Sequence, residues 1–394
     1  MTAIRQAHRW KDAPRTVGLD PWILVSTIGL LAIGVVMVAS TSIAIAEGYS
    51  VSVWHFISRH LIYIAMALVL ATALRFISSR HIEALAGFGL VAAIGLLLLP
   101  FIPGLGHEVN GSTRWINLGV VRFQVVEAAK LLMIVFVAGY LARQPELFRA
   151  RFIDALKPLL ASGVLVVILL KQPDMGSAVV IVAIVGGMVW LAGAAWRHLF
   201  MLGLAGVPLL TFAAIAEPYR LQRVMSYVDP WADPFNTGFQ LTQALIAVGR
   251  GQITGVGLGA SVQKLYYLPE AHTDFIFAVL AEEFGLIGIA MVLLLFGILI
   301  GRILQVGITA QLMEKPFQAF ICWGIALWIG IQALVSIGVN LGVLPTKGLT
   351  LPLISAGGSS LIMTILAISL VLRIQWELQR ETLARPRRRE RWTV

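Results

Sequence analysis

One acidic residue that accompanies several basic ones is the feature of this sequence with the clearest chemical use. Asp274 lies in the stretch LPEAHTDFIF, where a long apolar run begins. Basic residues, small polar residues and glycines also flank apolar runs in the segments NGSTRWINLGVVRFQVVEAAK and PTKGLTLPLISAGGSS. The candidate site residues are Asp274, Arg114, Arg122, Glu127, Lys130, Lys347, Ser355, Gly357 and Gly358.

These residue types predict group transfer from a phosphate-activated lipid. A carboxylate can take a proton from an attacking hydroxyl, and arginine or lysine can stabilise the negative charge that grows on a departing diphosphate. Glu127 and Lys130 share one helical face, so they form either a structural ion pair or a direct contact to the ligand. His272 would point roughly 200° away from Asp274 on a helix, so we do not expect it to act as a general base.

The motifs of several other chemistries do not occur in this sequence. It has no Ser-His-Asp order, HExxH, P-loop or Cys/His cluster, and Cys322 is its only cysteine. The stretch GQITGVGLGAS resembles GxGxxG, but no βαβ pattern surrounds it, so we expect no dinucleotide site. Asp229 and Asp233 have a spacing that metal ligands could share, and we interpret them as turn residues. The sequence predicts no certain cofactor and leaves open a divalent cation, Mg²⁺ or Mn²⁺.

The elements that must position these residues are membrane helices. The chain has 394 residues, of which 58% are hydrophobic and 13% charged, whereas soluble domains carry about 25% charged residues. The apolar residues fall in blocks close to the ~20 residues that cross a bilayer, and backbone groups in lipid must be satisfied internally. We therefore predict an all-α, polytopic membrane protein with ten transmembrane helices, at 22–46, 58–75, 82–102, 122–142, 157–171, 176–195, 199–217, 273–301, 317–341 and 355–374.

The distribution of charge predicts the orientation of these helices. Two thirds of the 30 lysines and arginines fall at the termini and in one set of loops, so we predict that both termini are cytoplasmic. The first apolar block is too long for a cleaved signal peptide, and we expect it to remain as a span. The predicted segments are a cytoplasmic amino terminus (1–21), helices 1–7 (22–217), a large periplasmic loop (218–271), helices 8–10 (272–374) and a basic cytoplasmic tail (375–394).

The outer face is expected to carry several lysines and arginines, although most of these residues are predicted on the cytoplasmic side. Arg250 and Lys264 are among ten lysines and arginines predicted on or near that side, which indicates an anionic ligand, internal pairing with nearby acids, or both. Within the large loop, FQLTQALIAVGRG predicts a short helix, and the glycine-rich stretch after it predicts a lid over a cavity. The tail RPRRRERW is expected to contact anionic lipid rather than nucleic acid.

Several motifs together resemble those of the SEDS family (shape, elongation, division and sporulation proteins). They are NGSTRWINLG, QPDMGSA, GFQLTQALIAVGRG, LPEAHTDFIFAVLAEEFGLIG and GVLPTKGLTLPLISAGGSS. The resemblance runs from about residue 20 to 375 and is closest to the cell-division branch of the family. One stretch departs from the family pattern, because Val125 and Val126 stand in QVVEAAK where the family usually has Pro and Ser.

The resemblance implies a peptidoglycan glycosyltransferase that polymerises lipid II at the outer face of the cytoplasmic membrane, at the division septum. Asp274 matches the family's catalytic aspartate, Arg122, Lys130 and Lys347 match its substrate-handling cations, and Glu127 matches the partner acid. The implied partners are a class B penicillin-binding transpeptidase of the FtsI type, the divisome complex FtsQ, FtsL and FtsB, and the lipid bilayer, with no nucleic acid. Glu282 and Glu283 are expected to serve packing or partner contacts.

Two other functions fit parts of the same pattern. A lipid II flippase would also need many helices and charges at membrane depth, and the third possibility is a non-catalytic divisome scaffold. The product discriminates between them, since a flippase moves lipid II unchanged and a polymerase makes glycan strands. A scaffold would retain its function without the Asp274 carboxylate.

Overall fold

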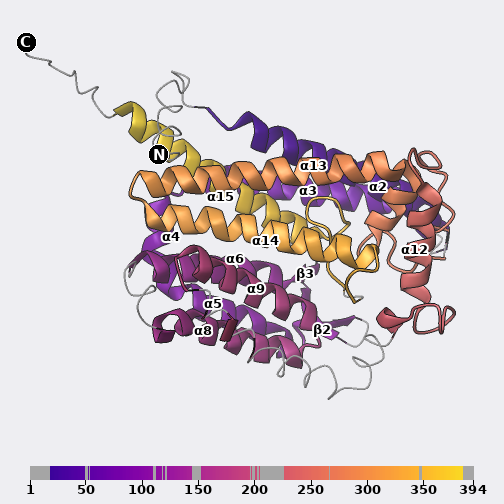
Figure 1. The fold of residues 1–394 in the computed structure, drawn as a ribbon, viewed down its shortest axis with the longest axis horizontal. Coiled ribbons are helices and arrows are strands. Elements are labelled where there is room, and N and C mark those ends of the chain that lie inside the picture. Colours follow the sequence, from indigo (N-terminus) through magenta and orange to yellow (C-terminus); the bar gives the residue numbers. More distant parts are fainter. Residues whose placement is uncertain are drawn as a thin grey trace, which may run out of the picture.

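The protein is a bundle of long helices, seen here in a computed structural model (Figure 1). The structure describes residues 18–48, 52, 54–109, 112–117, 119, 122–143, 152–195, 197, 200–201, 204, 226–265, 267–345 and 348–384. The helices are α2 (Pro21–Gly48), α3 (Trp54–Leu74), α4 (Ser79–Leu85), α5 (Gly89–Leu98), α6 (Val125–Arg143), α8 (Phe152–Lys171), α9 (Met175–Leu191), α12 (Phe239–Gly251), α13 (Ile276–Leu312), α14 (Pro316–Asn340) and α15 (Gly358–Ala384). Short 3-10 turns at Ala86–Phe88 and Leu99–Phe101 extend α4 and α5.

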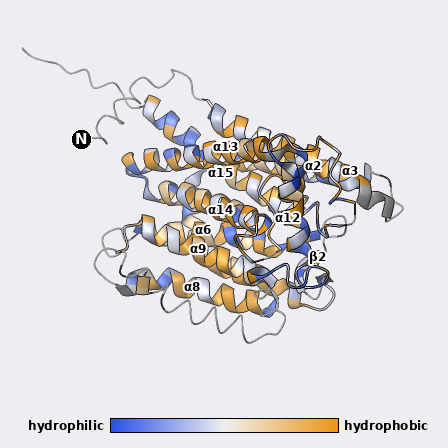
Figure 2. Ribbon diagram, turned by 45° about the vertical axis from the view of Figure 1, so that its right-hand side comes forward, coloured by the Kyte–Doolittle hydropathy of each residue, from blue (hydrophilic) through white to orange (hydrophobic). Residues whose placement is uncertain are grey.

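The prediction of a helical, polytopic membrane protein is confirmed. Among the described residues, seven helical segments are long and apolar enough to cross a membrane by length and composition, and α9 is a shorter apolar helix. Hydrophobic residues run along the helices, and hydrophilic ones gather around α12, β2 and the helix ends (Figure 2). The predicted span at 199–217 falls almost entirely outside the described residues, as do residues 1–17 and 385–394. The predicted span 355–374 is too short at its end, because α15 continues to Ala384 and includes the first half of the predicted tail. The count of ten spans and the cytoplasmic location of the termini stay predictions.

Helices α6 and α14 form the centre of the bundle. Two thirds of the most apolar stretch of each is buried, against about a tenth of that of α3. Helix α14 packs against α13, α6, α9 and α15, so polar residues on it lie inside the protein rather than toward lipid. This placement matters because buried polar groups need internal hydrogen-bond partners.

A small antiparallel sheet precedes α6, and the sequence did not predict it. Its strands are β1 (Gly106–Val109), β2 (Ser112–Asn117) and β3 (Arg122–Gln124), in that order. The predicted helix from 122 therefore begins three residues later, at Val125. The stretch VVRFQ is rich in β-branched and aromatic residues that favour a strand, and β3 pairs with β2 from Asn117 opposite Arg122 to Trp115 opposite Gln124. Helix α6 thus begins at Val125, the position where the family pattern has a proline.

Helix α13 is interrupted at Gly285, whose φ of 61° and ψ of −157° are not helical. The interruption leaves backbone groups on both sides without their helical partners, and the segment after α12 supplies new ones. The amides of Val256 and Gly257 donate to the carbonyls of Glu282 and Glu283 at 2.9 and 3.1 Å. In return, two α13 amides donate to this segment's carbonyls, Leu286 to Gln252 at 2.9 Å and Ile287 to Ile253 at 3.2 Å.

The predicted helix over FQLTQALIAVGRG is confirmed as α12, and it carries two glycines in contrasting environments. A Cβ at Gly251 would lie 1.9 Å from the carbonyl oxygen of Ala281, whereas a Cβ at Gly249 would meet nothing within 4 Å. Only the absence of a side chain at Gly251 therefore lets the end of α12 approach the backbone of α13 this closely.

Replacing Gly251 by alanine is expected to destabilise the protein by about 1–3 kcal/mol, because the new methyl group must push two backbones apart. Thermal unfolding of the purified protein in detergent measures this loss. The matched control is Gly249→Ala in the same helix, which should unfold at the wild-type temperature or slightly above it, since alanine favours a helix more than glycine does. Equal melting temperatures for the two variants would contradict the close approach.

Candidate active site

Asp274 lies in a turn before α13 and not in the helix, so the prediction that this helix begins at 273 is wrong. The helix starts at Ile276, and the Asp274 side chain is partly buried. Asn340, at the end of α14, fixes this junction: its side-chain amide donates to the Asp274 carbonyl at 2.9 Å, and its side-chain oxygen accepts from the Ala278 amide at 3.0 Å. The carboxylate is thus presented from a turn whose backbone is anchored to a neighbouring helix.

His272 occupies the same turn in an apolar environment. Its ring lies edge-on to that of Phe56, with the ring centroids 6.1 Å apart. Burial lowers the pKa of His272, and the charge of Glu270 opposes this effect. The helical angle on which we separated His272 from Asp274 does not apply to a turn. The partly buried ring packs against Phe56, and the expectation that His272 is not a general base stays a prediction.

The segment 348–357 lies against the Asp274 turn. The Ser355 hydroxyl donates to the Thr273 carbonyl at 2.7 Å and accepts from the Leu351 amide at 2.8 Å. The Ala356 amide donates to the His272 carbonyl at 3.0 Å. A Cβ placed on Gly348 would lie 3.0 Å from a carboxylate oxygen of Asp274, so this backbone passes beside the carboxylate.

This arrangement gives the predicted residues of the segment different functions. Ser355 is 3% exposed and holds the segment to the turn. Gly357 and Gly358 are close-packing positions, because a Cβ there would lie 2.9 Å from a Thr350 methyl carbon and 2.4 Å from the Tyr63 ring, respectively. Lys347 lies outside the described residues, so its predicted contact with the substrate stays a prediction.

Glu127 and Lys130 form the predicted ion pair, with 2.9 Å between Nζ and Oε1. Both are buried, at 3% and 1% exposed. Lys130 also donates to Oε1 of Gln332 at 2.6 Å, and its Nζ lies 5.1 Å from the ring centroid of Trp328. The structure thus shows an internal ion pair inside the bundle, and a direct contact of either residue with the substrate stays a prediction.

Arg122 and Arg114 both lie on the sheet but differ in their environment. Arg122 is exposed in β3. This strand is close to α15, because the Gln124 amide donates to the Ser359 hydroxyl at 2.8 Å and that hydroxyl donates to the Arg122 carbonyl at 3.4 Å. Arg114 forms an ion pair with Asp174 at 3.5 Å. Asp174 in turn caps α9 by accepting from the Ser177 amide at 3.1 Å. Arg122 is thus accessible to a ligand, and Arg114 is engaged with the start of a helix.

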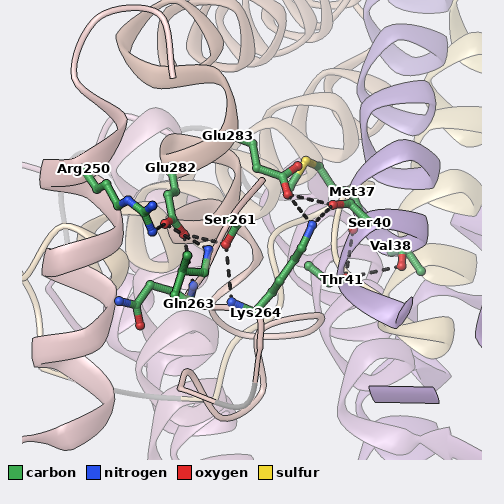
Figure 3. Close-up of polar contacts among 11 residues, drawn as sticks. Met37, Val38, Ser40, Thr41, Arg250, Ser261, Gln263, Lys264, Glu282 and Glu283 are labelled. Atoms are coloured by element: carbon green, nitrogen blue, oxygen red, sulfur yellow. Dashed lines mark hydrogen bonds and ion pairs between the residues drawn. The ribbon is translucent and has the colours of Figure 1, made fainter. Parts of the chain in front are cut away.

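Arg250 and Lys264, which the sequence predicts on the outer face, pair with the two acids of α13 (Figure 3). Arg250 lies 3.1 Å from Glu282, which also accepts from the Ser261 hydroxyl at 2.5 Å. Lys264 lies 2.8 Å from Glu283, and both contact the hydroxyl of Ser40 on α2. Glu282 and Glu283 therefore serve packing, as expected, and these two cations are engaged internally.

The aspartates with metal-like spacing close turns instead. Asp233 accepts from the Thr237 amide at 3.2 Å and from the Asn236 side chain at 3.0 Å. Asp229 accepts from the Trp231 amide at 3.2 Å. Among the described residues, no group of three or more His, Cys, Asp or Glu is arranged to hold a metal ion.

Sequence reasoning missed Gln332 and Asn340, which connect the parts of this site. Gln332 contacts Lys130, and its amide donates to the Thr350 carbonyl at 3.0 Å. Both residues are 0% exposed on α14. The available signal was a pair of large polar residues within an apolar membrane helix, since such residues face the protein interior and often mark a functional site.

Comparisons with known proteins agree with this architecture. The family model for FtsW, RodA and SpoVE, described as cell cycle protein, matches residues 21–380. Proteins named probable peptidoglycan glycosyltransferase FtsW are similar to this chain. That of Thioalkalivibrio sulfidiphilus is 47% identical over 95% of this chain and 94% of its own, and that of Legionella pneumophila is 44% identical over 97% and 98%.

Solved structures are similar over nearly the whole chain as well. A chain of a peptidoglycan synthase complex, studied for the coordination of polymerization and crosslinking, is 32% identical with a TM-score of 0.74, over 92% of this chain and 98% of its own. The rod shape determining protein RodA of Thermus thermophilus is 30% identical with a TM-score of 0.66, over the same shares. The family model spans nine tenths of the sequence, and this chain belongs to the FtsW/RodA/SpoVE family of cell cycle proteins.

Proposed function

We propose that this protein is a peptidoglycan glycosyltransferase that polymerises lipid II at the outer face of the cytoplasmic membrane during septal cell-wall synthesis. The relatives' names support the activity. The observation that carries the assignment of the site is the Asp274 turn, which Asn340 and Ser355 hold against the segment 348–357. A carboxylate fixed beside a glycine backbone suits a reaction in which a bulky substrate must approach closely.

In the proposed reaction, a sugar hydroxyl of one substrate attacks the anomeric carbon of another. The Asp274 carboxylate takes the hydroxyl proton, a glycosidic bond forms, and the bond from the anomeric carbon to the diphosphate oxygen breaks. Undecaprenyl diphosphate leaves with the electron pair, and nearby cations stabilise its charge. Arg122 is the exposed candidate for this contact, together with Lys347.

Lys130 acts differently in this proposal. Its side chain is fully buried and engaged with Glu127, Gln332 and the Trp328 ring. Contact with a diphosphate would require it to leave these partners, which a buried charge does only at a high free-energy cost. We therefore assign Lys130 to the support of the site from inside the bundle.

The proposed partner is a class B transpeptidase that crosslinks the new glycan, and the similarity to a synthase complex supports it. We place its membrane helix against α13 and α14, where a groove of about 430 Å³ lies between them. Small residues line this groove, and they allow two membrane helices to approach closely: Gly297, Gly330, Ala333 and Gly338. Regulation by FtsQ, FtsL and FtsB and enrichment at the septum belong to the same proposal.

Asp274→Asn is expected to fold and insert normally but to lose polymerisation, by on the order of 10²–10⁴-fold, because asparagine keeps the size of the side chain and lacks the basic oxygen. The measurement is glycan-strand formation from lipid II by purified protein with its transpeptidase. The control is Glu108→Gln, a neutralised acid that is exposed on β1. Near-normal polymerisation by Asp274→Asn would overturn the assignment of Asp274 as the general base, and only a wild type that forms no glycan strands would favour the flippase or scaffold function.

Lys130→Met is expected to destabilise the protein by about 3–5 kcal/mol, because it leaves the Glu127 carboxylate buried without its cation. Combining it with Glu127→Gln should restore much of this loss, since the double variant buries no charge at the pair. Thermal unfolding in detergent measures both effects. If the double variant were as unstable as Lys130→Met, the ion pair would not be the source of the loss.

A further inference from the structure

Gln332 joins the buried ion pair to the segment beside Asp274. Its Oε1 accepts from Nζ of Lys130 at 2.6 Å and from Nε1 of Trp328 at 2.8 Å. Its Nε2 donates to the Thr350 carbonyl at 3.0 Å and contacts the Ser360 hydroxyl at 3.4 Å. All the hydrogen-bonding positions of this fully buried amide are therefore used, by partners on α6, α14, the segment 348–357 and α15.

Only an amide of this length suits that position. A carboxamide offers an acceptor oxygen and two N–H donors, whereas a carboxylate offers acceptors alone and an apolar side chain offers neither. Glutamate at 332 would keep the contacts to Lys130 and Trp328 but could not donate to the Thr350 carbonyl. Asparagine would keep the chemistry but is one methylene too short to hold both sets of partners.

The Thr350 end of this contact lies close to the reacting group. Thr350 is two residues from Gly348, whose backbone passes beside the Asp274 carboxylate. The segment is thus fixed at two places: Gln332 holds it to α14 at Thr350, and Ser355 and Ala356 hold it to the Asp274 turn. Loss of the first anchor would leave the second in place and free the residues nearest the carboxylate.

We infer that Gln332 is a positioning residue for the transfer reaction, which couples the Glu127–Lys130 pair to the 348–350 backbone beside Asp274. This inference rests on the proposed function and adds to it a link between the buried ion pair and the catalytic carboxylate. It also explains how a lysine without an exposed side chain can influence the site. The pair orients Gln332, and Gln332 orients the backbone that borders the carboxylate.

The test compares Gln332→Met with Gln318→Met in lipid II polymerisation. Gln318 is the matched control, because it is a glutamine in the same helix, 8% exposed, and its amide donates to the Ser79 hydroxyl at 3.1 Å. Gln332→Met should lower kcat on the order of 10–100-fold with little change in KM, because displacement of reacting groups by about 1 Å has effects of this size. Gln318→Met should keep the wild-type kcat.

Gln332→Glu and hydrogen–deuterium exchange separate positioning from folding. Gln332→Glu should be as inactive as Gln332→Met, since it lacks the donor to Thr350. In both variants the peptide covering 348–356 should exchange faster than in wild type, with α14 unchanged. If Gln332→Met fails to fold, the same comparisons made with Gln332→Glu decide the outcome.

The outcomes distinguish this inference from the proposed function. An active wild type with equal kcat for Gln332→Met and Gln318→Met would overturn the role of Gln332 and leave the glycosyltransferase standing. An inactive wild type would overturn the glycosyltransferase. Hydrogen–deuterium exchange over 348–356 that is the same in the Gln332 variants as in wild type would overturn the anchoring by Gln332. Faster exchange confined to that segment supports the anchoring in either case.

Discussion

The interruption of α13 at Gly285 and the backbone hydrogen bonds that fill it are the constraint on which the rest of this structure depends. Peptide groups without partners are costly in a membrane protein, so a helix can break only where another segment supplies them. Residues 252–257 do so, with two bonds in each direction. The close approach needs glycine on both sides, at Gly255 and Gly285, where a Cβ would lie 2.1 and 2.5 Å from backbone atoms.

The interruption divides α13 into two parts with different tasks. Residues 286–312 alone would measure about 40 Å, which exceeds the ~30 Å hydrocarbon core. The short part, 276–284, is therefore not needed to cross the membrane. It bears the Asp274 turn at one end and the Glu282 and Glu283 ion pairs at the other. Buried ion pairs contribute little net stability but disfavour any register that leaves a charge unpaired, so they fix how the loop and this short helix meet.

The sequence predicted the helices well and the contacts between them poorly. Apolar blocks locate α2 and α14 to within two residues at each end, because the bilayer imposes their length and composition, whereas α15 continues ten residues beyond its apolar block. The same reasoning began the helix at 273, inside the polar stretch HTD that precedes the run FIFAVLAEEFGLIG, because residue types alone do not show where a turn ends and a helix starts. A glycine is the only sign of the interruption in that run. The partners of Arg250 and Lys264 depend on segments far apart in the chain, which local patterns do not encode. The surrounding cations and the family resemblance singled out Asp274 as the candidate carboxylate, and no local pattern indicated the residues that anchor its turn.

Lys130 shows that a charged residue in an apolar helix marks a functional position without showing whether the residue contacts the ligand or pairs inside the protein. The sequence could not separate an internal pair from a ligand contact, because both place a lysine near an acid in an apolar helix. The structure gives it Glu127, Gln332 and Trp328 as surroundings, and none of these is exposed by as much as 4%. An effect of such a lysine on chemistry must pass through the groups it contacts. Gln332 is the contact that reaches the segment 348–357, and its neutral amide fixes the position of that segment without adding a third buried charge beside Glu127 and Lys130.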